Sequence, residues 1–355
     1  MTGRARQLPF IVMAPCLPAR PRRFIRMRWN AFAHLKSRGA SMTCLIAYHD
    51  GDETDERQRG WQTRLAAYLP GCQLVPLDDK AADDAEIALV WAPPAGRLAE
   101  LSQLKLAVSL GQGVDHVMVP GKLPDNIPLI RIVDPDMSHA LSQWVILVAL
   151  DHLRDGPVYR EQARKRVFAP HNQRQTRGLR LAVYGMGAIG SIIATRLADI
   201  GFQVHGWSRS VRPQTSALTM HHGRKGFDNL LSNCQLHVCI LPLTDETRHI
   251  FDADSFAAMP RGAYFINGGR GAQVDESALL QAISSGHIAG ATLDVFEHEP
   301  LPDNHPFWDE PRITIWPHVA AQTNPETAAQ QVADAIIAVR AGQDPVNLVD
   351  RQRGY

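Results

Sequence analysis

The chain has 355 residues, of which 45% are hydrophobic and 21% charged, and this length allows two domains with sizeable cores. No apolar run approaches the roughly 18 residues of a membrane span, so we expect no membrane partner. The five cysteines include no C-x-x-C pair, which argues against a disulfide framework or a bound metal and favours the reducing cytoplasm.

Charge is unevenly distributed along the chain, although the net charge is only +1. Residues 1–41 contain eight Arg and one Lys without any Asp or Glu, and removing these nine leaves 28 basic against 36 acidic residues, a net charge of −8. The acidic remainder argues against a nucleic-acid partner. The basic segment could be a targeting sequence or an arm that binds nucleic acid or membrane. We interpret it as a disordered or non-native extension, with Met42 as a plausible start.

From residue 43 onward, predicted strands alternate with predicted helices. In the first part of the chain the expected strands are 43–48, 73–75, 87–91, 106–110 and 129–133. The expected helices are 61–69, 98–101 and a long one at 138–154, which begins with a serine and is followed by Gly156-Pro157. Such alternation predicts a parallel sheet with helices on both faces.

Two loops in this part follow predicted strands, where the ligands of parallel sheets bind. Trp-Ala-Pro-Pro at 91–94 could form either the wall of a ligand site or a plain turn. In Gly-Gln-Gly at 111–113 the small residues would let backbone amides point at an anionic substrate, with a structural turn as the alternative. The candidate substrate-binding residues are therefore Trp91, Gly111, Gln112 and Gly113.

A glycine-rich turn follows a polar interval at 160–177. The apolar run at 179–184 is typical of a strand, and a helix is predicted at 191–200. Between them, Gly185 would form the turn, Gly187 would let a pyrophosphate approach the backbone, and Gly190 would allow the helix to pack closely on the strand. The helix N-terminus would hold the anion. The predicted dinucleotide site consists of Gly185, Met186, Gly187, Ala188, Ile189 and Gly190.

The alternation continues to the end of the chain. Further strands are expected at 203–207, 237–241, 263–267, 290–293 and 313–316. Helices would lie between them, including one at 277–284 that stops at Gly286. Asn324-Pro325 is typical of an N-cap followed by a proline in the first helical turn, which predicts a last helix running to about residue 340.

The residues after the second strand of this part indicate which dinucleotide binds. NAD sites place an Asp or Glu there to hold the ribose hydroxyls, whereas basic residues accommodate the 2′-phosphate of NADP. This chain has Ser208, Arg209 and Arg212 and no carboxylate. Because an arginine matches a phosphate with two parallel hydrogen bonds, the prediction is NADP(H), with NAD(H) as the alternative. An exposed basic turn would explain Arg212 better than Arg209.

Reactive side chains collect in three later segments at predicted strand ends. These segments are Asn-Gly-Gly-Arg-Gly at 267–271, Asp-Val-Phe-Glu-His-Glu-Pro-Leu-Pro at 294–302 and Trp-Pro-His-Val-Ala at 316–320. With the glycine turn, they resemble the D-isomer-specific 2-hydroxyacid dehydrogenases over roughly residues 43–355. Trp-x-Pro-Pro at 91–94, Trp-Ser-Arg at 207–209 and the terminal Arg-Gly-Tyr are most similar to the branch of that family that reduces glyoxylate and hydroxypyruvate.

The resemblance implies three catalytic residues. Arg270 would bind the substrate carboxylate and polarise the carbonyl, His318 would be the general acid in reduction, and Glu299 would be its partner. These residue types suit the chemistry, since a 2-oxo acid needs a fixed cation, a hydride donor and a proton for the developing alkoxide. Histidine can deliver that proton near neutral pH, and an adjacent carboxylate favours a charged imidazole and orients it. Taken singly, each residue also has a purely structural explanation.

Further positions match the family less directly. The resemblance places four more residues at the cofactor, the last of them near the nicotinamide: Leu241, Pro242, Asn267 and Asp294. His298 and His305 compete with His318 for the role of acid, but neither lies on the matching motif, and we expect both to be exposed or adjacent to the substrate.

The chain departs from the family pattern at three places. Gln143 stands where many members have a Glu, so no role is carried over to it. Gly269 precedes the arginine where Ala or Ser is usual, and we expect the glycine to loosen the turn. The N-terminal segment has no counterpart in the family.

The resemblance implies an α/β fold of two doubly wound domains, each with a parallel sheet. A Rossmann cofactor domain at 142–317 would be inserted into a discontinuous, flavodoxin-like substrate domain formed by 42–141 and 318–355. The expected function is NADPH-dependent reduction of small 2-oxo acids, glyoxylate to glycolate and hydroxypyruvate to D-glycerate, by a homodimer. The alternatives are a reductase of a bulkier 2-oxo acid and a dinucleotide-sensing, corepressor-like protein without enzymatic activity.

Overall fold

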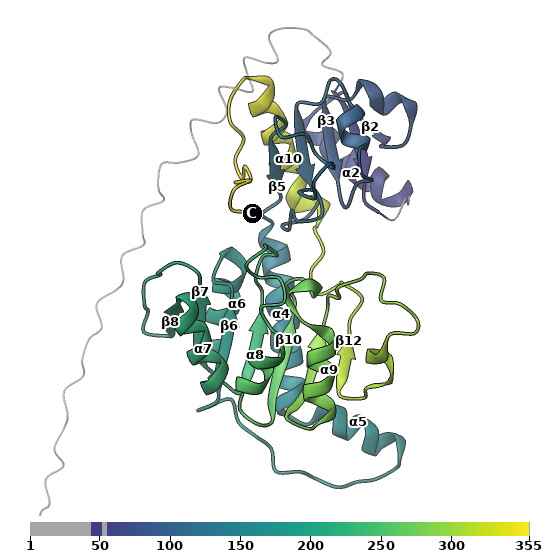
Figure 1. The fold of residues 1–355 in the computed structure, drawn as a ribbon. Coiled ribbons are helices and arrows are strands. Elements are labelled where there is room, and N and C mark those ends of the chain that lie inside the picture. The colour runs from purple at the N-terminus through teal and green to yellow at the C-terminus, as the bar shows by residue number, and fades with distance from the viewer. Residues whose placement is uncertain (1–43, 52–54, 355) are drawn as a thin grey trace, which may run out of the picture. The chain divides into compact units, whose positions relative to one another are not determined.

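The computed structural model describes residues 44–51 and 55–354 (Figure 1). The basic segment 1–41 and Met42, for which the sequence predicts an extension and a start, lie outside the described residues. The described residues form one unit by their internal contacts. None of the helices within the described ranges has the length and apolar character needed to cross a lipid bilayer.

Five short apolar segments form the first sheet, namely β1 (Cys44–His49), β2 (Cys72–Pro76), β3 (Ile87–Val90), β4 (Leu106–Ser109) and β5 (Leu129–Arg131). Their order is β2-β1-β3-β4-β5, and every neighbouring pair is parallel. This is the strand order of a flavodoxin-like, doubly wound sheet. β3 and β4 are buried at every position, as expected for central strands with both faces covered.

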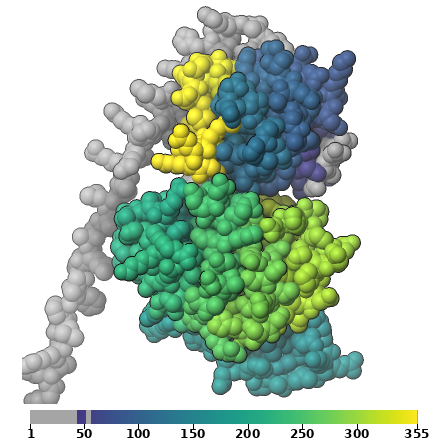
Figure 2. Space-filling model, in the orientation of Figure 1, coloured from purple at the N-terminus to yellow at the C-terminus, as the bar shows by residue number. Residues whose placement is uncertain are grey.

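Helices from both ends of the described chain cover one face of this sheet. They are α2 (Asp55–Tyr68) and α10 (Pro325–Arg340). Their apolar side chains share a cluster with Ile46 of β1, which includes Trp61, Leu65, Val332 and Ile336. In Figure 2 the yellow C-terminal segment lies directly against the blue surface of the first sheet's domain. Shorter elements lie along the first half of the chain as well, η1 (Lys80–Asp84) and α3 (Arg97–Glu100), and side chains of both join a second cluster on this sheet.

Seven strands form the second sheet, namely β6 (Arg180–Tyr184), β7 (Gln203–Ser208), β8 (Leu218–His222), β9 (Leu236–Cys239), β10 (Ala263–Asn267), β11 (Ile288–Leu293) and β12 (Ile313–Ile315). Neighbouring strands are parallel throughout, in the order β12-β11-β10-β9-β6-β7-β8. The chain builds outward from β6 in one direction and from β9 in the other, which is the Rossmann arrangement with its switch point between these strands. The prediction of two doubly wound parallel sheets is therefore confirmed.

Helices cover the second sheet, and its core has two apolar clusters. The helices are α4 (Pro135–Leu153), α6 (Ala188–Asp199), α7 (Gly223–Asn233), α8 (Ala253–Ala258) and α9 (Glu276–Ser284), and two short turns are η2 (Gly271–Gln273) and η3 (Pro306–Asp309). α4 and α6 contribute Trp144 and Ile193 to one cluster. α7, α8 and α9 contribute Phe227, Phe256 and Leu279 to the other. α4 also carries the chain from the first sheet to the second (Figure 1).

Three features differ from the predictions. α4 begins at Pro135 with the Asp134 side chain as its cap, about one turn before the predicted start. Gly156 and Pro157 open a further helix, α5 (Gly156–Arg164), which extends into the interval where the sequence predicts none, because proline suits the first turn of a helix. The sequence also does not predict β8, since Leu-Thr-Met-His-His has few apolar side chains and forms a partly exposed edge strand.

The remaining predicted elements lie close to the observed ones. The predicted strand 263–267 coincides with β10, and the predicted helix 277–284 is α9, which begins after an Asp275 cap. α10 starts as expected, with Asn324 Oδ1 accepting from Glu326 N at 3.0 Å and Pro325 in the first turn. Strand positions and helix caps could thus be predicted wherever the local pattern is strong.

Candidate active site

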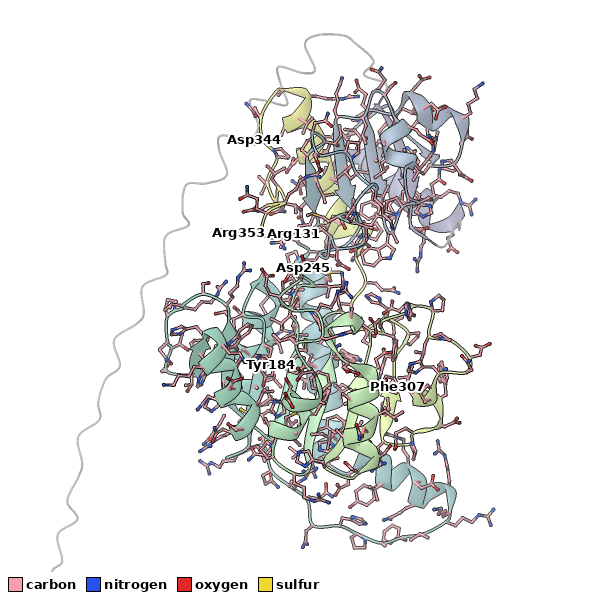
Figure 3. The ribbon with its side chains drawn as sticks, in the orientation of Figure 1. Arg131, Tyr184, Asp245, Phe307, Asp344 and Arg353 are labelled. Carbon is pink, nitrogen blue, oxygen red and sulfur yellow. The ribbon has the colours of Figure 1, made fainter. Side chains whose placement is uncertain are left out.

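A cavity of about 1700 Å³ lies between the two sheets, at the carboxyl ends of their strands. It is lined by residues from the loops after β3, β4, β6, β7, β9, β10, β11 and β12. Figure 3 labels Arg131 of β5 and Asp245 of the loop after β9, which mark the two sides where the sheets face each other. Most of the residues that the sequence singles out lie in these loops.

The glycine turn at the end of β6 is open to the cavity. Gly185 has a φ of +105°, and a Cβ there would lie 2.5 Å from the Ile240 carbonyl oxygen. A Cβ on Gly190 would lie 1.8 Å from the Gly185 carbonyl oxygen, so α6 packs more closely on the turn than a larger residue would allow. A Cβ on Gly187 would meet nothing within 4 Å, and no side chain caps α6. The first amides of α6 therefore face open space, which fits a bound pyrophosphate.

Basic side chains lie at the far end of the cavity, after β7. Arg209 and Arg212, for which the sequence predicts phosphate contacts, both line the cavity there. Ser208 lies beside them, and its hydroxyl donates to a backbone carbonyl two residues on at 2.8 Å. Glu246 lines the same end, and hydrogen bonding by Thr244, together with the charge of Arg209, lowers the pKa of its carboxyl group. This end can hold an anionic group such as a phosphate.

Arg224 adds a further cation to this end. It stands in the first turn of α7 and lines the cavity, although no sequence motif indicates it. Its guanidinium carbon lies 5.6 Å from the centre of the Phe227 ring, and its Nε pairs with Asp228 at 2.8 Å. Only the fold brings this residue near the end of β7.

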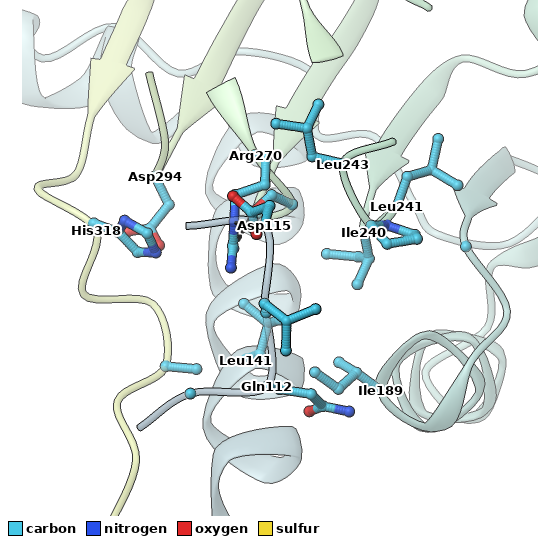
Figure 4. A pocket seen from close by; sticks show the side chains of 18 of the residues that line it. Gln112, Asp115, Leu141, Ile189, Ile240, Leu241, Leu243, Arg270, Asp294 and His318 are labelled. Atoms are coloured by element: carbon cyan, nitrogen blue, oxygen red, sulfur yellow. Dashed lines mark hydrogen bonds and ion pairs between the residues drawn. The ribbon is translucent and has the colours of Figure 1, made fainter. Parts of the chain in front are cut away.

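Arg270 follows β10, and its guanidinium group is held on three sides (Figure 4). Its Nε donates to Asp115 Oδ1 at 2.9 Å and its Nη1 to the Gly269 carbonyl at 2.8 Å. A Cβ on Gly113 would lie 1.6 Å from Nη2, so glycine leaves the room that the guanidinium group occupies. Burial raises the pKa of Asp115, but the charge and hydrogen bond of Arg270 outweigh this effect and the pKa lies below its usual value. The ion pair joins the loop after β4 in one sheet to the loop after β10 in the other.

A buried amide fixes the turn before Arg270. Gln273 Oε1 accepts from Arg270 N at 2.9 Å, while its Nε2 donates to the Leu241 carbonyl at 2.7 Å. Asn267 accepts from Gly269 N and donates to the Arg270 carbonyl, both at 3.0 Å, so its side chain points into the turn and is not part of the cavity wall. A Cβ on Gly269 would lie 2.5 Å from Gln273 Oε1. The glycine therefore permits a tight, hydrogen-bonded turn, contrary to the expectation of a loosened one.

His318 follows β12 and is hydrogen-bonded to Glu299. The distance from Nδ1 to Oε2 is 2.7 Å, and 30% and 33% of the two side chains are exposed. Burial raises the pKa of Glu299, but the hydrogen bond and charge of His318 outweigh this effect, so the group is a carboxylate. Since a carboxylate only accepts, Nδ1 carries the hydrogen and Nε2 is left for a ligand. Glu299 is fixed in turn by Phe296 N, which donates to Oε1 at 2.9 Å.

The loop that carries His318 is held by Asp294, a buried residue after β11 (Figure 4). His318 has a φ of +53°, and its N–H donates to the Asp294 carbonyl at 2.9 Å. The Asp294 carboxyl group accepts from Val319 N at 2.9 Å and Ala320 N at 3.0 Å. Burial raises its pKa to about 6, against the effect of these hydrogen bonds. Asp294 thus fixes the backbone on both sides of the histidine side chain through these three hydrogen bonds.

The predicted substrate-binding side chains point in different directions. The Trp91 ring centre lies 6.0 Å from that of His318 and 5.9 Å from the guanidinium carbon of Arg270. Gln112, in contrast, points toward Ile189 of the glycine turn and away from Arg270 and His318 (Figure 4). Its Oε1 is buried without a hydrogen-bond partner.

The other predicted residues contribute to the wall of the cavity, namely Gly111, Met186, Ala188, Ile189, Leu241 and Pro242. The competing histidines, His298 and His305, do not line it, and His305 pairs with a glutamate of α9 at 3.2 Å. Sequence reasoning missed Asp115, Gln273 and Arg224. Asp115 pairs with a residue 155 positions away, Gln273 bonds to the Leu241 carbonyl 32 positions away, and only the fold brings Arg224 to the cavity, so no local motif indicated these roles.

A dehydrogenase that uses a dinucleotide needs an open phosphate cradle, a cation for an acidic substrate and a proton donor near that cation. All three lie around the one cavity described above. The fold and the site place the chain in this class of enzymes.

Known proteins narrow the class to a family. The family model for the NAD-binding domain of D-isomer specific 2-hydroxyacid dehydrogenases matches residues 146–320. Glyoxylate/hydroxypyruvate reductase A of Yersinia enterocolitica is 37% identical over 316 residues, which cover 88% of this chain and 99% of the relative. The protein of the same name from Serratia proteamaculans is 38% identical over 319 residues, with the same coverage. The chain belongs to the D-isomer specific 2-hydroxyacid dehydrogenase family.

Solved structures agree with this assignment. A D-isomer specific 2-hydroxyacid dehydrogenase from Xanthobacter autotrophicus, in complex with NADPH and MES, has a TM-score of 0.81 and 37% identity, covering 88% of this chain and 99% of its own. An NADPH-dependent glyoxylate/hydroxypyruvate reductase from Sinorhizobium meliloti, in complex with NADP and sulfate, has a TM-score of 0.80 and 33% identity, covering 88% and 100%. The resemblance predicted from the motifs is thereby confirmed over most of the chain.

Proposed function

We propose that the chain reduces small 2-oxo acids with NADPH, converting glyoxylate to glycolate and hydroxypyruvate to D-glycerate. One observation carries the proposal. Arg270 and His318 lie 5.9 and 6.0 Å from the same Trp91 ring, in the cavity that also contains the glycine turn. A cation for a carboxylate and an acid for a carbonyl oxygen are thus within reach of one small molecule. Relatives named glyoxylate/hydroxypyruvate reductase A, at 37% and 38% identity, support this substrate class.

The residues of the cavity fit NADP(H) better than NAD(H). The open backbone at Gly187 suits the pyrophosphate, and three arginines at the far end suit the 2′-phosphate, namely Arg209, Arg212 and Arg224. No carboxylate stands at 208–212 to hold the ribose hydroxyls of NAD. When bound, the reduced nicotinamide supplies the hydride. Two similar structures hold NADPH or NADP, which supports this choice.

Arg270, His318 and Glu299 would each have a separate role in binding the substrate and transferring the proton. Arg270 would bind the substrate carboxylate through N–H groups that Asp115 and Gly269 do not occupy, among them those of Nη2. His318 would donate a proton from Nε2 to the carbonyl oxygen, while Glu299 accepts the hydrogen bond of Nδ1 and stabilises the charged ring. Backbone amides of the loop after β4 would add hydrogen bonds, and the cavity wall would limit access of water.

The test is a substrate panel with NADPH and NADH in parallel, on the wild type and His318→Ala. We expect reduction of glyoxylate and hydroxypyruvate with NADPH, and a fall in turnover of roughly 10²- to 10⁴-fold in the variant, the usual contribution of a general acid. His298→Ala is the matched control, because His298 is not part of the cavity wall, and it should keep its rate. An unchanged rate in His318→Ala would remove this residue as the acid. NADPH binding without turnover of any 2-oxo acid would identify a dinucleotide sensor instead.

The proposal includes the division into two domains, one formed by 42–141 with 318–355 and the other by 142–317. It is supported by the packing of α10, whose apolar side chains share a cluster with the first sheet. α4 and α6 share a different cluster with the second sheet.

A homodimer completes the proposal. α5 and the loop after it leave Val158 and Val167 about half exposed and Phe168 fully exposed, apolar surface that a single chain does not cover. We expect Phe168→Asp to convert the dimer into a monomer in size-exclusion chromatography with light scattering. Val346→Asp, at another exposed apolar residue, which lies in the other domain, should leave the mass unchanged. A monomeric wild type would contradict the proposed assembly.

A further inference from the structure

Trp91 follows β3, and its indole is fixed from several directions. Its backbone N–H donates to the His49 carbonyl at 2.6 Å, and Ala92 turns the chain with a φ of +43°. The ring lies against Gly111, where a Cβ would come within 2.6 Å of the ring carbon Cζ3. His116 packs on the indole with 3.9 Å between ring centres. The ring therefore cannot move aside unless the loop after β4 moves with it.

The residue that supports the indole is itself anchored. His116 Nε2 lies 3.4 Å from Ser109 Oγ, and the preceding residue, Asp115, holds Arg270. Burial lowers the pKa of His116 to about 3, so its ring is neutral at physiological pH and packs on the indole without a charge. One short segment, residues 111–116, thus fixes both the indole and the cation of the site.

The indole also bounds the space beside the two functional groups. The Arg270 guanidinium carbon lies 5.9 Å from its ring centre, and the His318 ring meets it edge to face at 6.0 Å with an interplanar angle of 78°. This separation lies within the range of edge-to-face ring pairs. A 2-oxo acid that places its carboxylate on Arg270 and its carbonyl oxygen on His318 carries one further substituent on C2. Because the indole lies beside both Arg270 and His318, it leaves little room for a C2 substituent that extends toward it.

We propose that Trp91 is the specificity-determining residue that restricts this site to 2-oxo acids whose C2 substituent is hydrogen or a one-carbon group. The inference rests on the proposed function and deepens it, since the sequence leaves the choice between a small and a bulkier substrate open. Tyr48, Gly60 and Trp61 line the same cavity. Trp91 lines this cavity as well, so the space freed by a smaller side chain at position 91 would be continuous with the cavity and available to a longer substrate.

The test compares the wild type with Trp91→Ala on straight-chain 2-oxo acids of two, three, four and six carbons, with NADPH. For the wild type we expect kcat/KM to fall at least tenfold between three and six carbons. In Trp91→Ala the ratio of kcat/KM for the six-carbon to the three-carbon acid should rise about 50-fold, chiefly through KM, because three further methylenes become buried at about fourfold each. The two-carbon acid, which does not reach the indole, should change least.

Two further variants keep the result interpretable. Trp91→Leu retains apolar packing on Gly111 and should give a smaller rise in the ratio, which guards against a Trp91→Ala protein that fails to fold. Trp308→Ala is the matched control, because this indole also lines the cavity but is half exposed on η3, and it should leave the ratio unchanged. Equal efficiency of the wild type with three and six carbons, an unchanged ratio in both Trp91 variants, or an equal rise in Trp308→Ala would overturn the proposal.

A binding measurement separates this inference from the proposed reaction. Oxamate and N-propyl oxamate are unreactive carboxylates with chains of three and six atoms, and their Kd values for the NADPH-loaded protein can be measured by calorimetry. The wild type should prefer oxamate, and Trp91→Ala should reduce that preference at least tenfold. This shift without any turnover would reject the proposed reaction and retain the size limit. Turnover of glyoxylate without the shift would reject the size limit and retain the reaction.

Discussion

The two ends of the cavity are built differently. At the end formed by the loops after β10, β11 and β12, hydrogen bonds of 2.7 to 2.9 Å hold each functional side chain: Arg270 to Asp115, His318 to Glu299, and Glu299 to a backbone amide. At the end formed by β7 and α7, the arginines lie at the surface. The Arg224 side chain is 73% exposed, and Arg212 is exposed as well.

The difference follows from what each end has to bind. Proton transfer requires groups that are oriented before the substrate arrives, because reorienting them during the reaction would raise the barrier. A phosphate is matched best by an arginine, but a lysine ammonium on a flexible side chain also binds it, as a point charge. The first end should therefore be sensitive to the shape of its side chains, and the second mainly to their charge.

Arg270→Lys should show the largest effect of this kind. Lysine keeps the charge, but its N–H groups all stand on one nitrogen and cannot reproduce the planar guanidinium fork that reaches Asp115, Gly269 and a substrate from separate nitrogens, so kcat/KM for glyoxylate should fall roughly 10²- to 10³-fold. The Kd for NADPH, measured by nucleotide fluorescence, should not change. Arg261→Lys, at an exposed position before β10, is the matched control and should alter neither quantity. Wild-type kinetics in Arg270→Lys would show that charge alone is enough at this end.

The buried His237 on β9 allows a test of how the central strands of the second sheet, which support both ends of the cavity, depend on pH. His237 is fully buried, and Tyr184, whose hydroxyl lies 3.0 Å from its Nδ1, directly precedes the glycine turn (Figure 3). Nε2 lies 3.0 Å from the Cys234 carbonyl and must donate to it, so Nδ1 accepts from the tyrosine. Burial lowers the pKa of His237 from 6.5 to about 4. The free energy of unfolding should therefore be highest above pH 6.5 and fall toward pH 4, by on the order of 3 kcal/mol.

Urea unfolding between pH 7.5 and pH 4.5 measures this loss. His237→Gln keeps a hydrogen-bond acceptor but cannot be protonated, so its unfolding free energy should depend less on pH than that of the wild type. Tyr184→Phe should lower stability by a similar amount at each pH. Burial also lowers the pKa of His116 to about 3 and of His152 to about 4, so a slope remains in every variant. The same slope in His237→Gln and the wild type would contradict the prediction.

The smallest effect is expected at the basic end. Arg209→Ala should lower kcat/KM for NADPH about 10- to 100-fold, the range expected for a lost charge-assisted hydrogen bond of roughly 1.5 to 3 kcal/mol, and leave the value for NADH nearly unchanged. Arg209→Lys should retain most of the rate, in contrast with Arg270→Lys. Arg212→Ala, at a more exposed residue, should lose less. An equal loss with NADPH and NADH would mean that Arg209 shapes the end of β7 without distinguishing the phosphate.

Much of the fold could be predicted because it follows from local patterns. β10 is apolar up to its last residue, and α10 starts with an asparagine cap and a proline, so both can be predicted from a few residues. β8 could not be predicted, since an edge strand is stabilised by its pairing with β7 and not by apolar side chains of its own. α5 was hidden by Pro157, which ends one helix pattern and begins another.

The site divides in the same way. Arg270, Glu299 and His318 stand in motifs that can be recognised one by one, and the structure brings Glu299 and His318 into contact. Asp115 lies in a loop whose glycines suggested only backbone contacts, and its partner is 155 positions away. Gln273 is buried between the loops after β9 and β10, where its amide joins the Leu241 carbonyl to Arg270 N, and no sequence pattern connects those two groups.

The last helix is synthesised after everything on which it packs. α10 completes the apolar cluster shared by α2 and β1, yet the ribosome makes it only after the whole second sheet. During translation one face of the first sheet therefore stays without its α10 covering until the last helix is made. The second sheet is contiguous in the chain and can fold as it emerges. Folding in the cell should proceed from the middle of the chain outward. The face of β1 that α10 later covers is then the apolar surface that a chaperone would have to protect.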